Sequence, residues 1–127
     1  MPAPGRQLRQ LLVESAERGD VYVPECPSRA VLDHITSRWG VLVLVGLLGG
    51  PLRFSELRRL VGGVSDKMLA QTLKLLQHDG FVARGAYLEM PMRVEYSLTD
   101  LGTEAAERLG GLVEWLQSNI GRVLTNA

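Results

Sequence analysis

The sequence predicts a mainly α fold of the α+β class, in which several helices are followed by one β-hairpin and a last helix. Two patterns carry this prediction. Apolar residues recur at i+3 and i+4 steps through most of the chain, with glycine-rich turns between the helical segments. Between residues 81 and 98 the pattern changes to two short extended runs joined by a turn, which is typical of a hairpin.

Length and composition indicate one soluble domain. The 127 residues are 46% hydrophobic and 22% charged, which is ordinary for a chain that buries a single core. The longest apolar run, 41–52, is interrupted by glycines and is shorter than the roughly 20 residues that span a bilayer. The N-terminus lacks the apolar stretch of a secretory signal, and a single cysteine excludes an internal disulfide. We therefore expect a cytoplasmic protein without a membrane segment.

Charge is balanced overall and distributed unevenly. The chain has 14 Lys and Arg against 14 Asp and Glu, so net charge gives no general attraction to nucleic acid. Residues 53–98 carry seven basic and five acidic side chains, whereas residues 99–127 carry two and four. The slight positive excess therefore falls on the middle of the chain.

The first half of the chain predicts three helices. The first covers 6–18 and has a leucine stripe on one face, formed by Leu8, Leu11 and Leu12. After an extended connector, the second is expected to begin at Cys26-Pro27-Ser28, because proline is favoured in a first helical turn. The third runs from Arg38 to about Leu48 with Thr36 or Ser37 as its cap. Its VLVLV core is equally compatible with a buried strand.

The middle of the chain predicts a pair of helices joined by a tight glycine turn. Residues 54–61 have apolar side chains at helical spacing, and Gly62-Gly63 ends this segment. Ser65 is a good N-cap for a helix from Asp66 to about Gln77, which Gly80 closes. One face of this helix is expected to be buried, and it comprises Met68, Leu69, Thr72, Leu73, Leu75 and Leu76.

The remaining segments are a hairpin and a long helix. The strands are 81–87 and 93–98, and Thr99 caps a helix with an apolar stripe from Leu101 to Leu124. Gly110-Gly111 within it predicts either a kink or close helix crossing at a dimer interface, or a break between two short helices. Two helices with a short glycine turn, followed directly by a hairpin, form the winged helix-turn-helix arrangement.

The outward face of the 66–77 helix is the candidate DNA-reading element. It carries Lys67, Ala70, Gln71, Lys74 and His78, with Ser65 at its start. Lysine can donate to guanine or phosphate, glutamine can pair with adenine, and alanine allows approach to a thymine methyl. Lys74 and His78 lie further along, where phosphate contacts are expected. The alternative is an ordinary solvated helix face.

Four arginines are candidates to extend this surface. Arg58 lies on the helix before the turn, and it or its neighbour Arg59 is expected to contact the DNA backbone. Arg84 and Arg93 lie on the hairpin, where they would reach flanking phosphates or the minor groove, and of the two the sequence favours Arg93 for a phosphate contact. For Arg93 the alternative is a surface ion pair with Glu95 or Glu89.

From about Glu25 to Gln117, the chain resembles the HxlR family of regulators. The matching residues are Cys26-Pro27, Arg38-Trp39, 52–57 (LRFSEL), 64–69 (VSDKML), Leu73, Leu76, 80–82 (GFV), Tyr87, Pro91, 93–99 (RVEYSLT), Gly102 and Trp115. The resemblance implies a transcription regulator that binds an inverted-repeat operator in double-stranded DNA as a homodimer. It also implies that 38–48 is a helix and that the first and last helices form the dimer.

The expected domain organisation follows from this resemblance. Residues 1–24 are an N-terminal dimerisation helix and connector, 25–99 are the winged helix-turn-helix core, and 100–127 are a C-terminal dimerisation helix. Nothing in the sequence pairs a nucleophile with a base or forms a phosphate-binding loop, so we expect neither an enzyme nor a cofactor. A winged helix that binds only other proteins is the alternative function.

Cys26 is a candidate redox-sensing residue. It lies at a helix start, where the helix dipole favours a thiolate, whereas the nearby Glu25 disfavours one. The family resemblance implies that a cysteine here responds to oxidants or electrophiles. The alternative is an inert buried cysteine. A small-molecule effector between the core and the dimer helices stays open. His34 and His78 are too scattered around Cys26 to predict a metal site.

Overall fold

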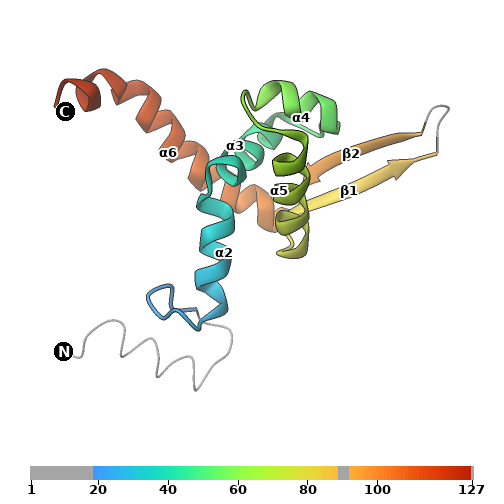
Figure 1. Cartoon of the computed structure of the whole chain (residues 1–127), viewed down its shortest axis with the longest axis horizontal. Coiled ribbons are helices and arrows are strands. Elements are labelled where there is room, and N and C mark those ends of the chain that lie inside the picture. Colours follow the sequence, from blue (N-terminus) through green and yellow to red (C-terminus); the bar gives the residue numbers. More distant parts are fainter. Residues whose placement is uncertain (1–18, 89–91, 127) are drawn as a thin grey trace.

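The computed structural model describes residues 19–88 and 92–126 (Figure 1). Its elements, in chain order, are α2 (Pro27–Thr36), α3 (Arg38–Gly46), the 3-10 turn η1 (Leu47–Gly49), α4 (Phe54–Leu60), α5 (Asp66–His78), β1 (Val82–Tyr87), β2 (Arg93–Leu98) and α6 (Asp100–Thr125). This order confirms the mainly α fold with a helix pair and a two-stranded wing. The helix expected at 6–18 lies outside the described residues.

A sharp corner joins α2 to α3. The two helices are bent by 70° at Ser37, whose hydroxyl accepts a hydrogen bond from the Gly40 amide at 3.1 Å and donates one to the His34 carbonyl at 2.9 Å. Ser37 is therefore the cap, whereas Thr36 bonds within α2 to the Leu32 carbonyl. A Cβ on Gly40 would lie 2.1 Å from the His34 carbonyl oxygen, so the corner requires glycine here.

Helix α3 is at the centre of the core, and the strand alternative for its VLVLV segment is wrong. Val43 and Leu44 are fully buried in it. The core around them is formed by Leu47, Leu57, Val61, Val64, Leu69, Leu73, Leu76, Phe81, Val82 and Ala106. Because all of the core-forming helices contact α3, tertiary packing decides a choice that local β propensity leaves open.

Helix α5 begins and ends as the sequence predicts. Ser65 accepts a hydrogen bond from the Met68 amide at 3.1 Å. At the other end Gly80 has φ +87°, and the Phe81 amide bonds to the Leu76 carbonyl at 2.9 Å, which is the pattern of a glycine-terminated helix. The buried face is narrower than expected, since Met68 and Leu75 are 39% and 37% exposed at its two edges.

The wing is an antiparallel hairpin that projects away from the helices (Figure 1). Its register runs from Val82 opposite Leu98 to Tyr87 opposite Arg93. Leu52 adds an isolated bridge to Tyr96, which ties the segment before α4 to the base of the wing.

Helix α6 is continuous from Asp100 to Thr125, so of the two alternatives for Gly110-Gly111 the break between two short helices is wrong. A Cβ on Gly110 would meet Leu48 at 3.5 Å, and one on Gly111 would meet nothing within 4 Å in this chain. Only the first turns of α6 reach the core, and its second half extends beyond the other helices (Figure 1). That half exposes a row of large apolar side chains, namely Leu112, Trp115, Leu116, Ile120, Val123 and Leu124.

No single helix within the described ranges is long and apolar enough to cross a membrane. The α2 and α3–η1 segments satisfy the length and composition requirement only when taken together across their 70° bend.

Candidate nucleic-acid interface

The outward face of α5 is open to solvent along its length. Lys67, Ala70, Gln71 and Lys74 are exposed, opposite the side that packs on the core. The polar side chains of Lys67, Gln71 and Lys74 make no hydrogen bond or ion pair with any residue in the described part of the chain. We call these four residues the polar stripe. Their functional groups are available for an external partner.

An ion pair flanks the N-terminal end of the polar stripe. Arg58 Nη1 on α4 lies 2.8 Å from Asp66 Oδ1, the first residue of α5, and both side chains are more than half exposed. Together with Phe54, Ser55 and Arg59 they line a hollow of about 320 Å³. The guanidinium of Arg58 is thus held beside the start of α5, whereas the side chain of Arg59 has no polar partner among the described residues.

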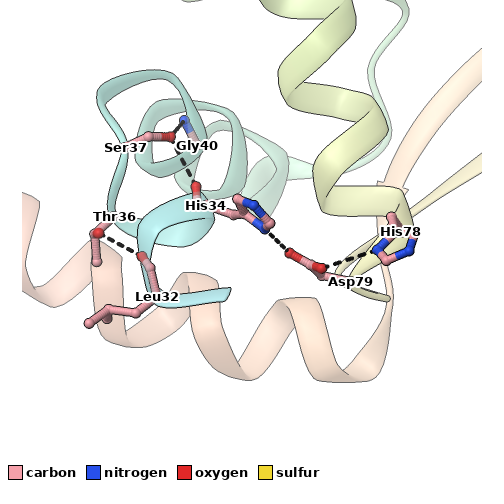
Figure 2. Close-up of polar contacts among 7 residues, drawn as sticks. All are labelled: Leu32, His34, Thr36, Ser37, Gly40, His78 and Asp79. Atoms are coloured by element: carbon pink, nitrogen blue, oxygen red, sulfur yellow. Dashed lines mark hydrogen bonds and ion pairs between the residues drawn. The ribbon is translucent and has the colours of Figure 1, made fainter. Parts of the chain in front are cut away.

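The C-terminal end of α5 carries a second polar cluster (Figure 2). Asp79, the C-cap residue, has a side chain that is only 7% exposed. Its Oδ2 lies 2.5 Å from His34 Nδ1 on α2, and its Oδ1 lies 3.4 Å from His78 Nδ1. His34 is 25% exposed and His78 is 85% exposed, so His78 continues the polar stripe into solvent.

The two candidate arginines of the wing differ in their surroundings. Arg84 is exposed on β1, without a polar partner in the described residues. Arg93 on β2 lies over the Tyr87 ring, 5.1 Å from its centroid, and its Nε is 4.0 Å from Glu95 Oε1. Arg93 therefore contacts its cross-strand neighbour Tyr87 and lies near Glu95 in the absence of DNA.

Cys26 occupies a polar niche at the start of α2. Its buried sulfur accepts a hydrogen bond from the Asp20 amide at 3.3 Å and lies 3.0 Å from Ser28 Oγ. The hydrogen bond from the Asp20 amide, followed by those from the Ser28 hydroxyl and amide, lowers the pKa of Cys26 below the usual thiol value. Burial and the Asp20 carboxylate oppose this shift, so Asp20 takes the part that sequence reasoning gave to Glu25.

The Asp20 carboxylate is itself buried beneath this turn. Its Oδ1 accepts a hydrogen bond from the Tyr22 amide at 3.0 Å, whereas Oδ2 has no hydrogen-bond partner among the described residues. In the described ranges no three His, Cys, Asp or Glu side chains come together in a way that could hold a metal ion.

Sequence reasoning missed three acidic residues of these sites. Asp66, Asp79 and Asp20 each have a partner at a distance in sequence that helical spacing does not reveal. For Asp79 a signal existed, because a carboxylate at a helix C-terminus is unfavourable and requires compensation. The compensating His34, 45 residues earlier, could be found only from the fold.

The chain has close relatives among known proteins. A family model described as HxlR-like helix-turn-helix matches residues 34–123. The HTH-type transcriptional regulator YtfH of Escherichia coli K12 is 51% identical over 113 residues, which cover 89% of this chain and 90% of that protein. Among solved structures, transcriptional regulator YtfH from Salmonella typhimurium has a TM-score of 0.81 and 50% identity, covering 86% of this chain and 97% of that one.

A further solved structure is that of the redox regulator HypR in its oxidised form. It matches with a TM-score of 0.68 and 35% identity, over 74% of this chain and 97% of that one. The family model spans well over half of the sequence, and the YtfH relatives match over nearly the whole of their own lengths. The chain therefore belongs to the HxlR-like family of helix-turn-helix transcriptional regulators, as the resemblance in its sequence implied.

Proposed function

We propose that this regulator binds a specific inverted-repeat operator in duplex DNA as a homodimer, with the polar stripe of α5 in the major groove. The observation that carries the proposal is the exposure of Lys67, Gln71 and Lys74 on a helix whose other face is fixed in the core. A helix held in this way presents its side chains in a defined geometry, which base recognition requires.

Each residue of the stripe is assigned a contact by its chemistry. Lys67, near the N-terminal end, donates to a guanine edge or a phosphate, Gln71 pairs with adenine, and Ala70 packs on a thymine methyl. Lys74 and His78 contact phosphates where the helix leaves the groove. Ser65 lies at the start of this surface, although its hydroxyl oxygen also caps α5.

Arginines outside α5 contact the flanking backbone in this proposal. Arg84 is exposed on the wing, so it is the favoured wing contact. Arg93 is the weaker candidate, because it would first have to leave Tyr87 and Glu95. Arg58 contacts phosphate through the guanidinium nitrogens that Asp66 does not engage.

A second copy of the chain covers the apolar row on α6 in this proposal. Six large apolar side chains on the outer half of one helix form a surface that a monomer would leave in water. Two-fold pairing through this 100–127 segment, with help from 1–24, would place two α5 helices in successive major grooves about 34–36 Å apart. Residues 25–99 then act as the DNA-binding core.

Operator variants test the site assignment. Lys74→Ala should weaken binding to operator and unrelated duplex by the same factor, because it removes a phosphate contact. Gln71→Ala should remove the preference for one base pair, which corresponds to about 1–3 kcal/mol of discrimination. Mobility shifts with wild-type and single-substituted operators measure both effects. Unchanged affinity in both variants would refute the assignment.

Protein binding without DNA binding is the competing function. The balanced net charge favours it, since a basic excess is the usual signature of a DNA-binding domain. The two functions differ in salt dependence. DNA affinity should fall steeply between 50 and 200 mM salt as phosphate contacts release counterions. Binding to a protein surface lacks this steep fall.

We also propose that Cys26 makes DNA binding responsive to oxidants or electrophiles. The lowered thiol pKa supports this role by raising the thiolate fraction, and the similar protein HypR is a redox regulator. Burial of the sulfur favours the inert alternative. If a Cys26→Ser protein still releases DNA upon diamide treatment, Cys26 is not the sensor. A small-molecule effector remains the competing signal.

A further inference from the structure

A polar contact between α2 and the end of α5 is not itself among the DNA contacts proposed above, although one of its residues, Asp79, also lies 3.4 Å from the proposed contact His78. His34 Nδ1 lies 2.5 Å from Asp79 Oδ2, so the imidazole donates a hydrogen bond to the carboxylate (Figure 2). His34 belongs to α2 and Asp79 caps α5, and the two residues are 45 positions apart in the sequence. Neither residue belongs to the polar stripe, and both are largely shielded from solvent.

Asp79 is in an unfavourable place if α5 is considered alone. It is the C-cap of the helix, where the negative end of the macrodipole repels a carboxylate. It is also 7% exposed, so its charge has lost most of its hydration. The His34 hydrogen bond offsets both costs. The reason for an acid at this position therefore lies in the contact with α2.

His34 is fixed on its own side of the contact. Its backbone carbonyl accepts the Ser37 hydroxyl, and Gly40 packs against the same carbonyl at the α2–α3 corner. The imidazole thus extends from a corner whose geometry is set by two helices. A contact with the imidazole can therefore set the orientation of α5 relative to this corner.

Asp79 is the position at which α5 leads into the wing. Gly80 follows with a positive φ, the Phe81 amide bonds back to Leu76, and β1 begins at Val82. A contact at Asp79 therefore restrains the end of the recognition helix and the start of the wing together.

We propose that the His34–Asp79 contact is a positioning contact, which sets the orientation of α5 and the wing against the α2–α3 corner. The proposal rests on the proposed function, in which α5 and the wing touch DNA. Neither His34 nor Asp79 reaches the DNA. They act through Lys67, Gln71 and the wing, whose contacts require placement to within about 0.5 Å.

Hydrogen exchange on the DNA-free protein tests the positioning directly. His34→Ala and Asp79→Asn should each accelerate amide exchange at Gly80 and Phe81 by about tenfold or more, because local opening becomes easier when a restraint is removed. The matched control is Thr36→Val at the same end of α2, since the Thr36 hydroxyl bonds only to Leu32 within its own helix. It should leave these two amides unchanged.

Operator binding separates positioning from a purely structural role. Asparagine is well tolerated at a helix end, so a structural role predicts that Asp79→Asn keeps both melting temperature and DNA preference. The proposal instead predicts a preference for operator over unrelated duplex that is about tenfold lower in the folded variant, as when base contacts weaken. The double variant should lose no more preference than the more strongly affected single variant, because both changes act on the same contact.

Several outcomes would overturn the proposal. The first is a folded single variant that keeps the wild-type preference for operator over unrelated duplex. The second is a double variant in which the two losses of preference multiply. The third is amide exchange at Gly80 and Phe81 that the substitutions leave unaltered. If His34→Ala fails to fold because it leaves a buried carboxylate, Asp79→Asn alone decides the question. If the wild-type protein shows no preference for its operator, the proposed function fails, and amide exchange still decides whether the contact positions α5.

Discussion

At the scale of single residues, the availability of cations for the proposed DNA contacts depends on which of them form ion pairs, more than on the net charge of the chain. Lys67 and Lys74 have no acidic partner among the described residues, whereas Arg58 is paired with Asp66 at the start of the same helix. A chain with zero net charge thus presents unpaired cations on one helix face. Exposed ion pairs contribute little stability, so the proposed role of the Arg58–Asp66 pair is to orient Arg58 toward DNA.

Asp66→Asn should raise affinity for unrelated duplex DNA by about fivefold, because a carboxylate beside phosphates is repulsive by about 1 kcal/mol. Affinity for the operator should rise less, since Arg58 loses the group that orients it. Titrations with both DNAs measure the ratio. Asp100→Asn is the matched control, because Asp100 is likewise the first residue of a capped helix. Equal gains for both DNAs would contradict an orienting role.

The pH dependence of Cys26 follows from its hydrogen bonds. Since these bonds lower the pKa of the thiol, its reaction with a small alkylating reagent should reach half of its maximal rate below the pH typical of a free cysteine. In linkage terms, a thiol whose pKa is lower in the folded protein than in the unfolded chain stabilises the fold at pH values above the unfolded-state pKa. This stabilisation is lost as the pH falls through the folded-state pKa. Rates measured from pH 5 to 10 test this, and Ser28→Ala should shift the midpoint upward. A midpoint at or above that of free cysteine would be inconsistent with the observed niche.

At the scale of elements, local signals predicted most boundaries, and tertiary packing decided the remainder. Ser65 and Gly80 mark the ends of α5 by their chemistry, so they could be recognised in the sequence. The VLVLV segment could not be assigned from residues alone, because its helical state comes from the packing of Val43 and Leu44 in the core, which local propensity does not show. A helical wheel predicts that Met68 and Leu75 face the core, but it does not show how wide a part of the helix the rest of the domain covers. Both side chains therefore lie partly exposed at the edges of the buried face.

The close approach of α6 to the α5–wing turn gives a stability prediction. A Cβ on Gly102 would lie 1.9 Å from the Phe81 carbonyl oxygen, so Gly102→Ala should destabilise the fold by about 1–3 kcal/mol. Gly121→Ala should instead stabilise it by about 0.5–1 kcal/mol, because Gly121 is a helical residue with open space around it. Denaturant titrations measure both changes. The packing described for α6 is wrong if the two variants shift stability in the same direction.

At the scale of the whole molecule, the wing and the outer half of α6 extend in opposite directions from one core (Figure 1). The wing end of the molecule carries exposed arginine, and the α6 end carries the apolar row. This separation fits a division of labour in which one end contacts DNA and the other contacts a second copy. The polar stripe and the apolar stripe of α6 were both predictable because each lies on one helix, whereas the exposure of the outer half of α6 became evident only from the fold.

Leu116→Glu should shift the proposed dimer to folded monomers, raising the dissociation constant by at least about tenfold, because it places a charge at the centre of the apolar row. The fold should persist, since only the first turns of α6 reach the core. Gln117→Glu adds the same charge one residue further along, outside the apolar row, and should leave assembly unchanged. Sedimentation equilibrium distinguishes the two variants. A Leu116→Glu protein that remains dimeric would place the interface elsewhere.

Footprinting of the purified protein on the DNA upstream of its own gene tests the central claim most directly. We expect two protected segments on the same side of the duplex, about one helical turn apart and related by an inverted repeat, with protection lost on raising the salt to 200 mM. In the Lys67→Ala/Lys74→Ala protein the protection should disappear at a lower salt concentration. Protection that survives this substitution unchanged, or its absence even at low salt, would contradict the assignment of α5 as the DNA-reading helix.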